Sequence, residues 1–449
     1  MVNPLQNVMD IRKEELPLSL LMFSYFFLVI TSFWILKPIK KSLFIEFYDA
    51  SGFDLFSWHM QASQAELLAK VLNMVVAFVA VVVFTWLARR FRRQQLSVIF
   101  TGFFMACFVA YTFVINTPGD FTAWTFYLFG DLYSTLMVAT FFAFLNDSVT
   151  PDKAKRLYGL VGLGGVTGGA FGSTFVAVWV DDLDTSSWLW ICFGIAFAIG
   201  VVALAAGRLV DRNPPVEETE KPTPDTAPEG KSNPALEGAR LVMRSPYLLA
   251  ILGIVGLYEI VSTIMDFQFT STIAHYLEPP EIGRQFSRIF AITNIVAMLV
   301  QIFLTSLVMT RFGLTVALLV LPLAVLVGSG GFLAVPILWV GSFLNTADNG
   351  FSYSINQSAK EALYVPRTRD EKYKAKAFID MFVQRFAKAL AVGVSLGITA
   401  IFSDFSTIRW LSVFTVVVVV VWIYAARYAG RHFQKMTQSK VGSATEVAV

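Results

Sequence analysis

The chain has 449 residues, of which 56% are hydrophobic and 15% are charged. A soluble chain of this length would carry about 25% charged residues, so the composition excludes an ordinary soluble protein. The net charge of +3 does not indicate a nucleic-acid partner, because the cations lie where the topology of a membrane protein requires them.

Apolar runs of about 20 residues recur along the chain, and each is long enough to cross the ~30 Å hydrocarbon core of a bilayer. We therefore expect an all-α polytopic membrane protein with about twelve transmembrane helices in two six-helix halves. The predicted spans are 17–47, 64–88, 95–116, 122–146, 157–180, 186–208, 246–275, 287–309, 313–328, 332–356, 377–402 and 407–427.

The first span ends with three lysines inside apolar sequence, Lys37, Lys40 and Lys41. These positions share one face of a helix, and a charge at membrane depth costs at least ~2.5–3.5 kcal/mol on insertion scales. Clustered ammonium groups repel one another unless an anion lies among them, so the pattern predicts anion binding. The alternative is that the lysines extend to the outer membrane surface.

The fourth span begins with another ionisable group, Asp131, two residues before Tyr133. The fifth span opens with Gly164, Gly168 and Gly172, whose small-xxx-small spacing lets membrane helices approach closely. A hinge in a moving helix is the alternative to close packing.

Residues 211–236 contain six prolines and many charges, a composition that predicts a disordered linker. Similar motifs recur on both sides of it, as at Asn146 and Asn356, which indicates the major facilitator plan of two parallel six-helix repeats. The predicted domains are an N-terminal half, 1–210; a disordered cytoplasmic linker, 211–245; a C-terminal half, 246–430; and a cytoplasmic tail, 431–449.

The second half also carries polar groups inside its spans, and in the major facilitator plan spans 1, 4, 7 and 10 line a central cavity. Interhelical hydrogen bonding alone is the alternative for the amides of the tenth span. The polar residues of spans 7, 10 and 11 that we consider for the site are Tyr258, Asp266, Asn349, Tyr353, Arg385 and Lys388, and Glu259 shares a helix face with Asp266.

The loops 147–156 and 357–376 match each other in their Lys/Arg, Asn and Tyr residues, and we expect them to act as cytoplasmic gates. The predicted gate residues are Asn146, Lys155, Arg156, Lys360 and Glu361.

Lysine and arginine set the predicted orientation, because 26 of the 35 lie at the N-terminus, in the even-to-odd loops and in the C-terminal tail. Both termini are therefore expected in the cytoplasm, with the chain in the inner membrane. Cys107, Cys192 and three scattered histidines indicate neither a disulfide framework nor a metal site, and no cofactor is expected. No nucleophile–base arrangement indicates an enzyme.

Three stretches carry the motifs of a known family. They are Leu36-Lys37-x-x-Lys40; Phe144-x-Asn146 with Ala154-Lys155-Arg156-x-Tyr158; and Tyr353-Ser354, Lys360-Glu361-x-x-Tyr364-x-Pro366, Lys374-x-Lys376-Ala377-x-x-Asp380 and Arg385-x-x-Lys388. They resemble the ATP/ADP translocases of obligate intracellular bacteria and plastids, over nearly the whole chain. The resemblance implies nucleotide transport.

The chain departs from this family at five positions. Asp131 and Asp266 stand where the family has glutamates, and Asn349 and Ser352 stand where many members have lysines. Lys41 stands where the family has an aspartate, so we expect it to matter less than its neighbours. The departures indicate a site rebuilt for a smaller or differently charged substrate.

We therefore expect a transporter that moves an anionic, nucleotide-like solute, with ATP or ADP as candidates, by alternating access and as an exchanger. It is expected to be a monomer surrounded by lipid. Two alternatives stay open: a proton-coupled carrier of another organic solute, and a non-transporting scaffold or lipid-handling protein. The predicted substrate-binding residues are Lys37, Lys40, Asp131, Tyr133, Tyr258, Asp266, Asn349, Tyr353, Arg385 and Lys388.

Overall fold

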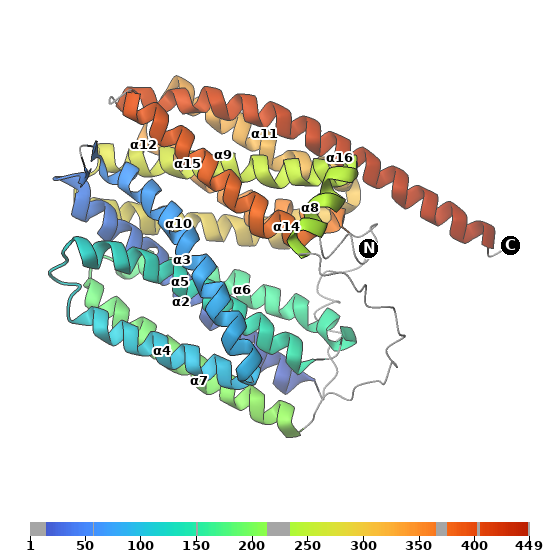
Figure 1. Cartoon of the computed structure of the whole chain (residues 1–449), viewed down its shortest axis with the longest axis horizontal. Coiled ribbons are helices and arrows are strands. Elements are labelled where there is room, and N and C mark those ends of the chain that lie inside the picture. Colours follow the sequence, from blue (N-terminus) through green and yellow to red (C-terminus); the bar gives the residue numbers. More distant parts are fainter. Residues whose placement is uncertain are drawn as a thin grey trace. The chain divides into compact units, whose positions relative to one another are not determined.

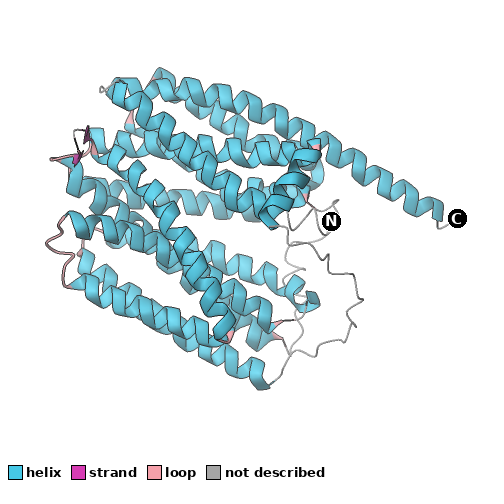
Figure 2. Ribbon diagram, in the orientation of Figure 1, coloured by secondary structure: helices cyan, strands magenta, loops and turns pink. Residues whose placement is uncertain are grey.

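The fold was analysed in a computed structural model, which describes residues 15–56, 58–149, 151–212, 234–364, 375–401 and 405–447. Within these ranges the chain is almost entirely helical, with one antiparallel hairpin of β1 (Phe53–Leu55) and β2 (Trp58–Met60) (Figure 2). Most of the predicted linker and the second predicted gate loop from 365 to 374 lie outside the described residues.

The chain divides into two compact units, and α10 (Glu281–Leu299) belongs to both. Unit 1 contains this helix as far as Asn294, and unit 2 contains the rest of it. The other helices of unit 1 are α2 (Leu16–Asp49), α3 (Ala62–Arg90), α4 (Arg93–Thr112), α5 (Asp120–Ser148), α6 (Pro151–Trp179) and α7 (Thr185–Arg212) (Figure 1).

Unit 2 differs from unit 1 in that several of its helices contain π-helical turns, in which one turn holds an extra residue. Its α-helices are α8 (Pro234–Arg244), α9 (Pro246–Tyr276), α11 (Gly313–Ala334), α12 (Leu338–Phe351), α13 (Gln357–Leu363), α14 (Lys376–Phe378), α15 (Gln384–Ile401) and α16 (Leu411–Val447). The π-helical turns are η1 (Val300–Thr305), η2 (Val308–Phe312), η3 (Ser352–Asn356) and η5 (Ile379–Val383), and η6 (Phe405–Trp410) is a 3₁₀-helix.

Ten helical segments among the described residues are long and apolar enough to cross a membrane. The two remaining predicted spans fall where helices follow one another without a break, α12–η3–α13 over 338–363 and α14–η5–α15 over 376–401. Polar side chains interrupt both stretches, among them Asn345 and Asp348 in the first and Gln384 and Arg385 in the second. The predicted all-α, multi-pass fold class is confirmed.

The prediction of disorder is wrong for part of the linker, because residues 234–244 form the amphipathic helix α8. The prolines that mark the linker end at Pro234, which begins the helix, where proline is well tolerated. Val242 of α8 is fully buried, and the helix packs against α9 and α14.

The glycines of α6 let it approach α2 closely, as the sequence predicts. A Cβ atom on Gly164, Gly168 or Gly172 would lie 2.9, 2.5 and 2.5 Å from backbone oxygens of α2. The hydroxyl of Thr31 donates a hydrogen bond of 3.2 Å to the carbonyl of Gly168. Backbone contact of this kind replaces the hydrophobic driving force that lipid cannot supply.

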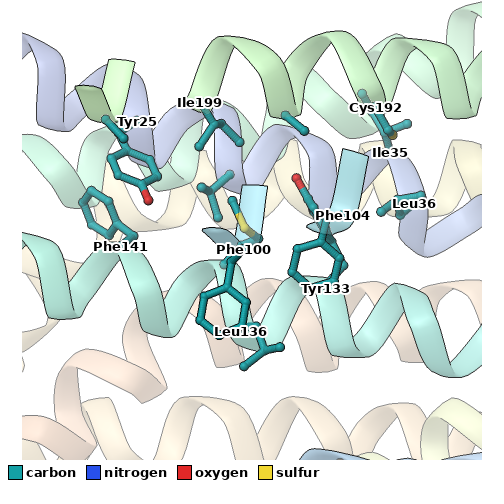
Figure 3. Close-up of a cluster of buried hydrophobic side chains, with 14 of the residues drawn as sticks. Tyr25, Ile35, Leu36, Phe100, Phe104, Tyr133, Leu136, Phe141, Cys192 and Ile199 are labelled. Atoms are coloured by element: carbon teal, nitrogen blue, oxygen red, sulfur yellow. The ribbon is translucent and has the colours of Figure 1, made fainter. Parts of the chain in front are cut away.

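The core of unit 1 is rich in aromatic side chains from α2, α4 and α5. Tyr25 packs edge-on against Phe141, and Phe104 packs edge-on against Tyr133, with ring centroids 5.0 and 4.9 Å apart (Figure 3). The thiol of Cys192 on α7 is buried in the same cluster. The aromatic core fixes the helices that carry the polar residues described next.

Candidate functional site

A buried ion pair joins α2 to α5 in unit 1. The ammonium of Lys40 contacts Asp131 Oδ1, and the amide of Asn73 on α3 donates a 2.6 Å hydrogen bond to Asp131 Oδ2. A Cβ at Gly130 would lie 2.6 Å from Cδ of Lys40, so the absence of a side chain there makes room for the lysine. The ammonium of Lys40 also lies 4.4 Å from the ring centroid of Tyr127.

A second ionic group centres on Glu66 of α3, which is fully buried. Its Oε1 accepts a 2.7 Å hydrogen bond from the hydroxyl of Tyr127 and lies 3.5 Å from the ammonium of Lys41. Its Oε2 lies 2.9 Å from the ammonium of Lys70, one helical turn away on α3. Removing one partner of a buried ion pair typically costs about 3–5 kcal/mol, so these side chains depend on one another.

Aromatic rings cover the remaining lysine of α2. The ammonium of Lys37 lies 4.4 Å from the ring centroid of Trp34 and 4.9 Å from that of Phe290 on α10. The ammonium of Lys41 lies 5.2 Å from the ring centroid of Phe286, also on α10. Each such cation–π contact contributes roughly 0.5–2 kcal/mol, depending on desolvation.

We call Lys37, Lys40, Lys41, Lys70, Glu66 and Asp131 the lysine cluster. It holds four ammonium groups and two carboxylates, and Lys40 and Lys41 are only 5% and 4% exposed. A lysine that extends to the membrane surface keeps its ammonium in water or among headgroups. The structure therefore does not support that alternative for Lys40 and Lys41.

Tyr133, a predicted substrate-binding residue, lies in the aromatic core. Its side chain is fully buried, its ring packs against Phe104 and Phe108, and its hydroxyl lies 2.7 Å from that of Ser32. Two residues along a helix face different sides, which is why Asp131 joins the lysine cluster and Tyr133 does not. Tyr133 is therefore not part of the site that we propose.

Unit 2 carries polar residues on facing sides of α9, α12 and α15. The ammonium of Lys388 lies 3.4 Å from Glu259 Oε2, so Lys388 pairs with a residue outside the predicted binding set. Ser262 donates a 2.6 Å hydrogen bond to Asp348, which is 1% exposed. The hydroxyl of Tyr258 is hydrogen-bonded to that of Ser352.

The other predicted residues of unit 2 lie along the same helices. Tyr353 is 47% exposed and lies within electrostatic reach of Asp266 and Lys388. The amide of Asn349 donates a 3.0 Å hydrogen bond to the carbonyl of Asn345. Arg385 is half-buried near the start of α15. α9 and α12 of unit 2 thus carry three carboxylates, Glu259, Asp266 and Asp348.

The predicted gate residues of unit 2 lie at the end of one helix. Lys360 of α13 is buried, with its ammonium 5.0 Å from the ring centroid of Tyr258. Its neighbour Glu361 forms an ion pair of 2.6 Å with Lys376. Both contacts tie the ends of the second predicted gate loop to the helices of unit 2.

Among the predicted gate residues of unit 1, the side chain that the structure describes is that of Asn146. Asn146 is exposed near the end of α5. Lys155 and Arg156 lie in the first turns of α6, and their side chains lie outside the described part.

Comparison with known proteins decides the family. The model of the Major Facilitator Superfamily matches residues 18–367, well over half of the chain. The chain belongs to the Major Facilitator Superfamily. A second family model, the TLC ATP/ADP transporter, matches residues 333–433, the stretch that contains Tyr353, Lys360 and Arg385. This match confirms the resemblance to the ATP/ADP translocases.

Known members of the superfamily resemble the chain along most of its length. ADP,ATP carrier protein 2 of Chlamydia trachomatis is 23% identical over 439 residues, which cover 81% of this chain and 80% of the relative. The chloroplastic ADP,ATP carrier protein 1 of Arabidopsis thaliana is 23% identical over 348 residues, which cover 69% of this chain and 54% of the relative.

Solved structures of the superfamily share the fold. The nucleoside transporter NupG matches with a TM-score of 0.63 at 12% identity, over 92% of this chain and 99% of that one. A bacterial homologue of the lysosomal transporter Spinster, inward-facing and unoccupied, matches with a TM-score of 0.59 at 12% identity, over 95% of this chain and 99% of that one. This superfamily member is a multi-pass membrane transporter and not an enzyme.

The sequence of this superfamily member did not lead us to Glu66 and Lys70 of the lysine cluster, or to Asn73 and Tyr127, which contact the cluster. The signal for Glu66 is present, because it is an acid within an apolar run and lies four residues before Lys70. Tyr127 carries no such signal, since a tyrosine in a membrane helix is most often a packing residue.

Proposed function

We propose that this transporter moves an anionic, nucleotide-like solute and binds its anionic groups through the lysine cluster of unit 1. The observation that carries the proposal is the burial of Lys40 and Lys41, which lie with the partly buried Lys37 and Lys70 near two carboxylates. An anionic substrate adds the negative charge that these groups accommodate, through charge-assisted hydrogen bonds. Neutral solutes offer the cluster no such compensation.

The names of the relatives support a nucleotide as the substrate. Carriers of Chlamydia and of plastids that are named for ADP and ATP align with 69–82% of this chain. Asp131, Asp266 and Asn349 depart from the family pattern. We therefore expect these residues, and not the names of the relatives, to determine which nucleotide this chain prefers. Asp266, Arg385, Lys388, Tyr258 and Tyr353 are the residues of unit 2 that we propose for the rest of the binding site.

We propose that transport is an exchange by alternating access, carried out by a monomer. When no substrate is bound and the carboxylates move away, the ammonium groups of the lysine cluster repel one another. This repulsion slows the reorientation of the empty carrier. Bound substrate removes that repulsion. The halves 1–210 and 246–430, the linker 211–245 and the tail 431–449 stay our proposed domains. We also propose that the protein lies in an inner membrane and that its gate residues lie on the cytoplasmic side. These residues are Asn146, Lys155, Arg156, Lys360 and Glu361.

Flux through proteoliposomes tests this function. Liposomes that contain the purified protein are loaded with ADP, AMP, phosphate or buffer, and the uptake of labelled ATP is measured. We expect uptake that depends on internal nucleotide and falls at least ten-fold with Lys40→Ala. Lys435→Ala, at an exposed lysine of α16, is the matched control and is expected to transport normally. Uptake of no nucleotide under any loading would refute the proposal.

A proton-coupled carrier of another organic anion is the second candidate. The observation that favours it is the set of three carboxylates, Glu259, Asp266 and Asp348, on α9 and α12 of unit 2. Carboxylates at membrane depth serve as proton relays in many transporters. Uptake into empty liposomes that depends on an imposed pH gradient would support this candidate over exchange.

A further inference from the structure

Neither the family motifs nor the proposed function gives a role to Glu66. Its side chain is fully buried within the candidate membrane span Ala62–Ala88, and each carboxylate oxygen faces a different lysine. Lys41 lies 3.5 Å from one oxygen and Lys70 lies 2.9 Å from the other. One carboxylate therefore lies between two ammonium groups.

This group is distinct from the Lys40–Asp131 pair. Lys40 and Lys41 are consecutive on α2, so their side chains leave the helix about 100° apart. Lys40 meets Asp131 with Asn73, and Lys41 meets Glu66 with Lys70. Tyr127 separates the two groups, with its ring against Lys40 and its hydroxyl on Glu66.

A carboxylate held in this way resembles a bound anionic group. Phosphoryl groups present acceptor oxygens in a similar arrangement, with up to two negative charges and three oxygens. Two ammonium groups already placed around one carboxylate can hold a phosphoryl group after little movement. Glu66 then competes with the substrate for the same two lysines.

We propose that Lys41 and Lys70 form a second anion subsite, which Glu66 occupies in the empty carrier and yields to an additional anionic group of the substrate. The proposal rests on the proposed function in that the substrate is taken to be a nucleotide. It reverses the expectation that Lys41 matters less than its neighbours, because Lys41 completes the subsite.

Binding of AMP and ADP by the full-length purified protein tests the subsite, with the dissociation constant measured by ligand-induced thermal stabilisation. Lys70→Gln and Lys41→Gln are each expected to weaken ADP binding about ten-fold or more and AMP binding less than two-fold. Lys40→Ala is expected to weaken both ligands. Lys435→Gln, outside the cluster, should change neither.

Glu66→Gln gives the opposite prediction, because the amide keeps the shape and removes the competing charge. ADP affinity should rise several-fold, and the ratio of ADP to AMP affinity should rise with it. A merely structural glutamate would leave that ratio unchanged. If Glu66→Gln does not fold, the ratio measured for the half-exposed Lys70→Gln decides alone.

Equal weakening of AMP and ADP binding by Lys41→Gln and Lys70→Gln would overturn the second subsite. Failure of all nucleotides to bind the unaltered protein would instead refute the proposed function. In that event pyrophosphate and phosphate replace ADP and AMP as probes. Pyrophosphate binding that is lost in Lys70→Gln supports the subsite, and absence of pyrophosphate binding to the unaltered protein overturns it.

Discussion

Gly130 determines where the side chain of Lys40 can lie. The lysine passes through the space that a Cβ at this position would fill, on its way to Asp131. The chemistry of the site therefore depends on a residue with no functional group. A single methyl group tests this dependence without changing any charge.

Gly130→Ala should displace Lys40 from Asp131 and weaken binding of the substrate about ten-fold, because one charge-assisted contact contributes roughly 1.5–3 kcal/mol. The protein should still fold, since alanine favours a helix over glycine by about 1 kcal/mol. Gly102→Ala on α4, where a Cβ meets nothing within 4 Å, is the control. Ligand-induced thermal stabilisation measures both, and equal affinity in the two variants would contradict the argument.

The sequence was sufficient to draw attention to Lys40 and Asp131, which the structure brings into contact, because ionisable residues in apolar spans are rare and costly. It could not predict that Glu66 holds two lysines, since that depends on how α2, α3 and α5 pack. The partners of Tyr133 also depend on packing. Its position near Asp131 suggested a role in binding, but it lies on another face of the helix and packs in the aromatic core. Residue type indicated function, and packing selected the partners.

At the scale of helices, the contact between α2 and α6 depends on glycine. Gly168 faces the backbone of α2, whereas Gly162 of the same helix meets nothing within 4 Å. Alanine substitutions at these two glycines therefore distinguish the effect of helix propensity from the effect of packing between helices.

Gly168→Ala should destabilise the protein by about 1–3 kcal/mol, because its Cβ would lie 2.5 Å from the carbonyl oxygen of Phe27 and the backbones must separate. Gly162→Ala should be neutral or slightly stabilising. The apparent melting temperature in one detergent measures both variants. Similar melting temperatures for the two would show that α6 is free to shift away from α2.

The N-terminal part of α10 is fastened to unit 1 by polar contacts. The guanidinium of Arg284 makes contacts of 2.9 and 3.0 Å with Asp181, at the end of α6. The backbone N–H of Gly283 donates a 3.0 Å hydrogen bond to Glu46 of α2. Phe286 and Phe290, which cover Lys41 and Lys37, follow directly on this helix.

Arg284→Ala should loosen this part of α10 while changing global stability by less than about 1 kcal/mol, because the ion pair is half-exposed. Hydrogen–deuterium exchange of residues 281–290 should become faster. Arg288→Ala removes an exposed arginine one turn further along and serves as the control. Unchanged exchange in Arg284→Ala would mean that the aromatic contacts alone hold the helix.

At the scale of the whole molecule, each unit has its own group of ionisable residues. The lysine cluster lies in unit 1, whereas Glu259, Asp266 and Asp348 lie in unit 2. The sequence predicted the all-α, multi-pass fold class and ten of its twelve spans, because apolar length identifies a span.

Orientation is the prediction that belongs to the whole chain. With 26 of 35 Lys and Arg on one side, residues 211–245 should face the cytoplasm. Ser232→Cys, in a chain whose Cys107 and Cys192 are replaced by alanine, should resist membrane-impermeant thiol reagents in intact cells. The same thiol should react after the membrane is permeabilised. Reaction in intact cells would reverse the orientation.

The π-helical turn η3 gives its helix a means of rotation. Such a turn holds one residue more than an α-turn, so its conversion to α-helical geometry rotates the following segment by about 100° with little translation. Tyr353 lies within the turn and Lys360 follows it. One rearranged turn would therefore swing the ammonium of Lys360 away from the ring of Tyr258 while α12 itself stays in place.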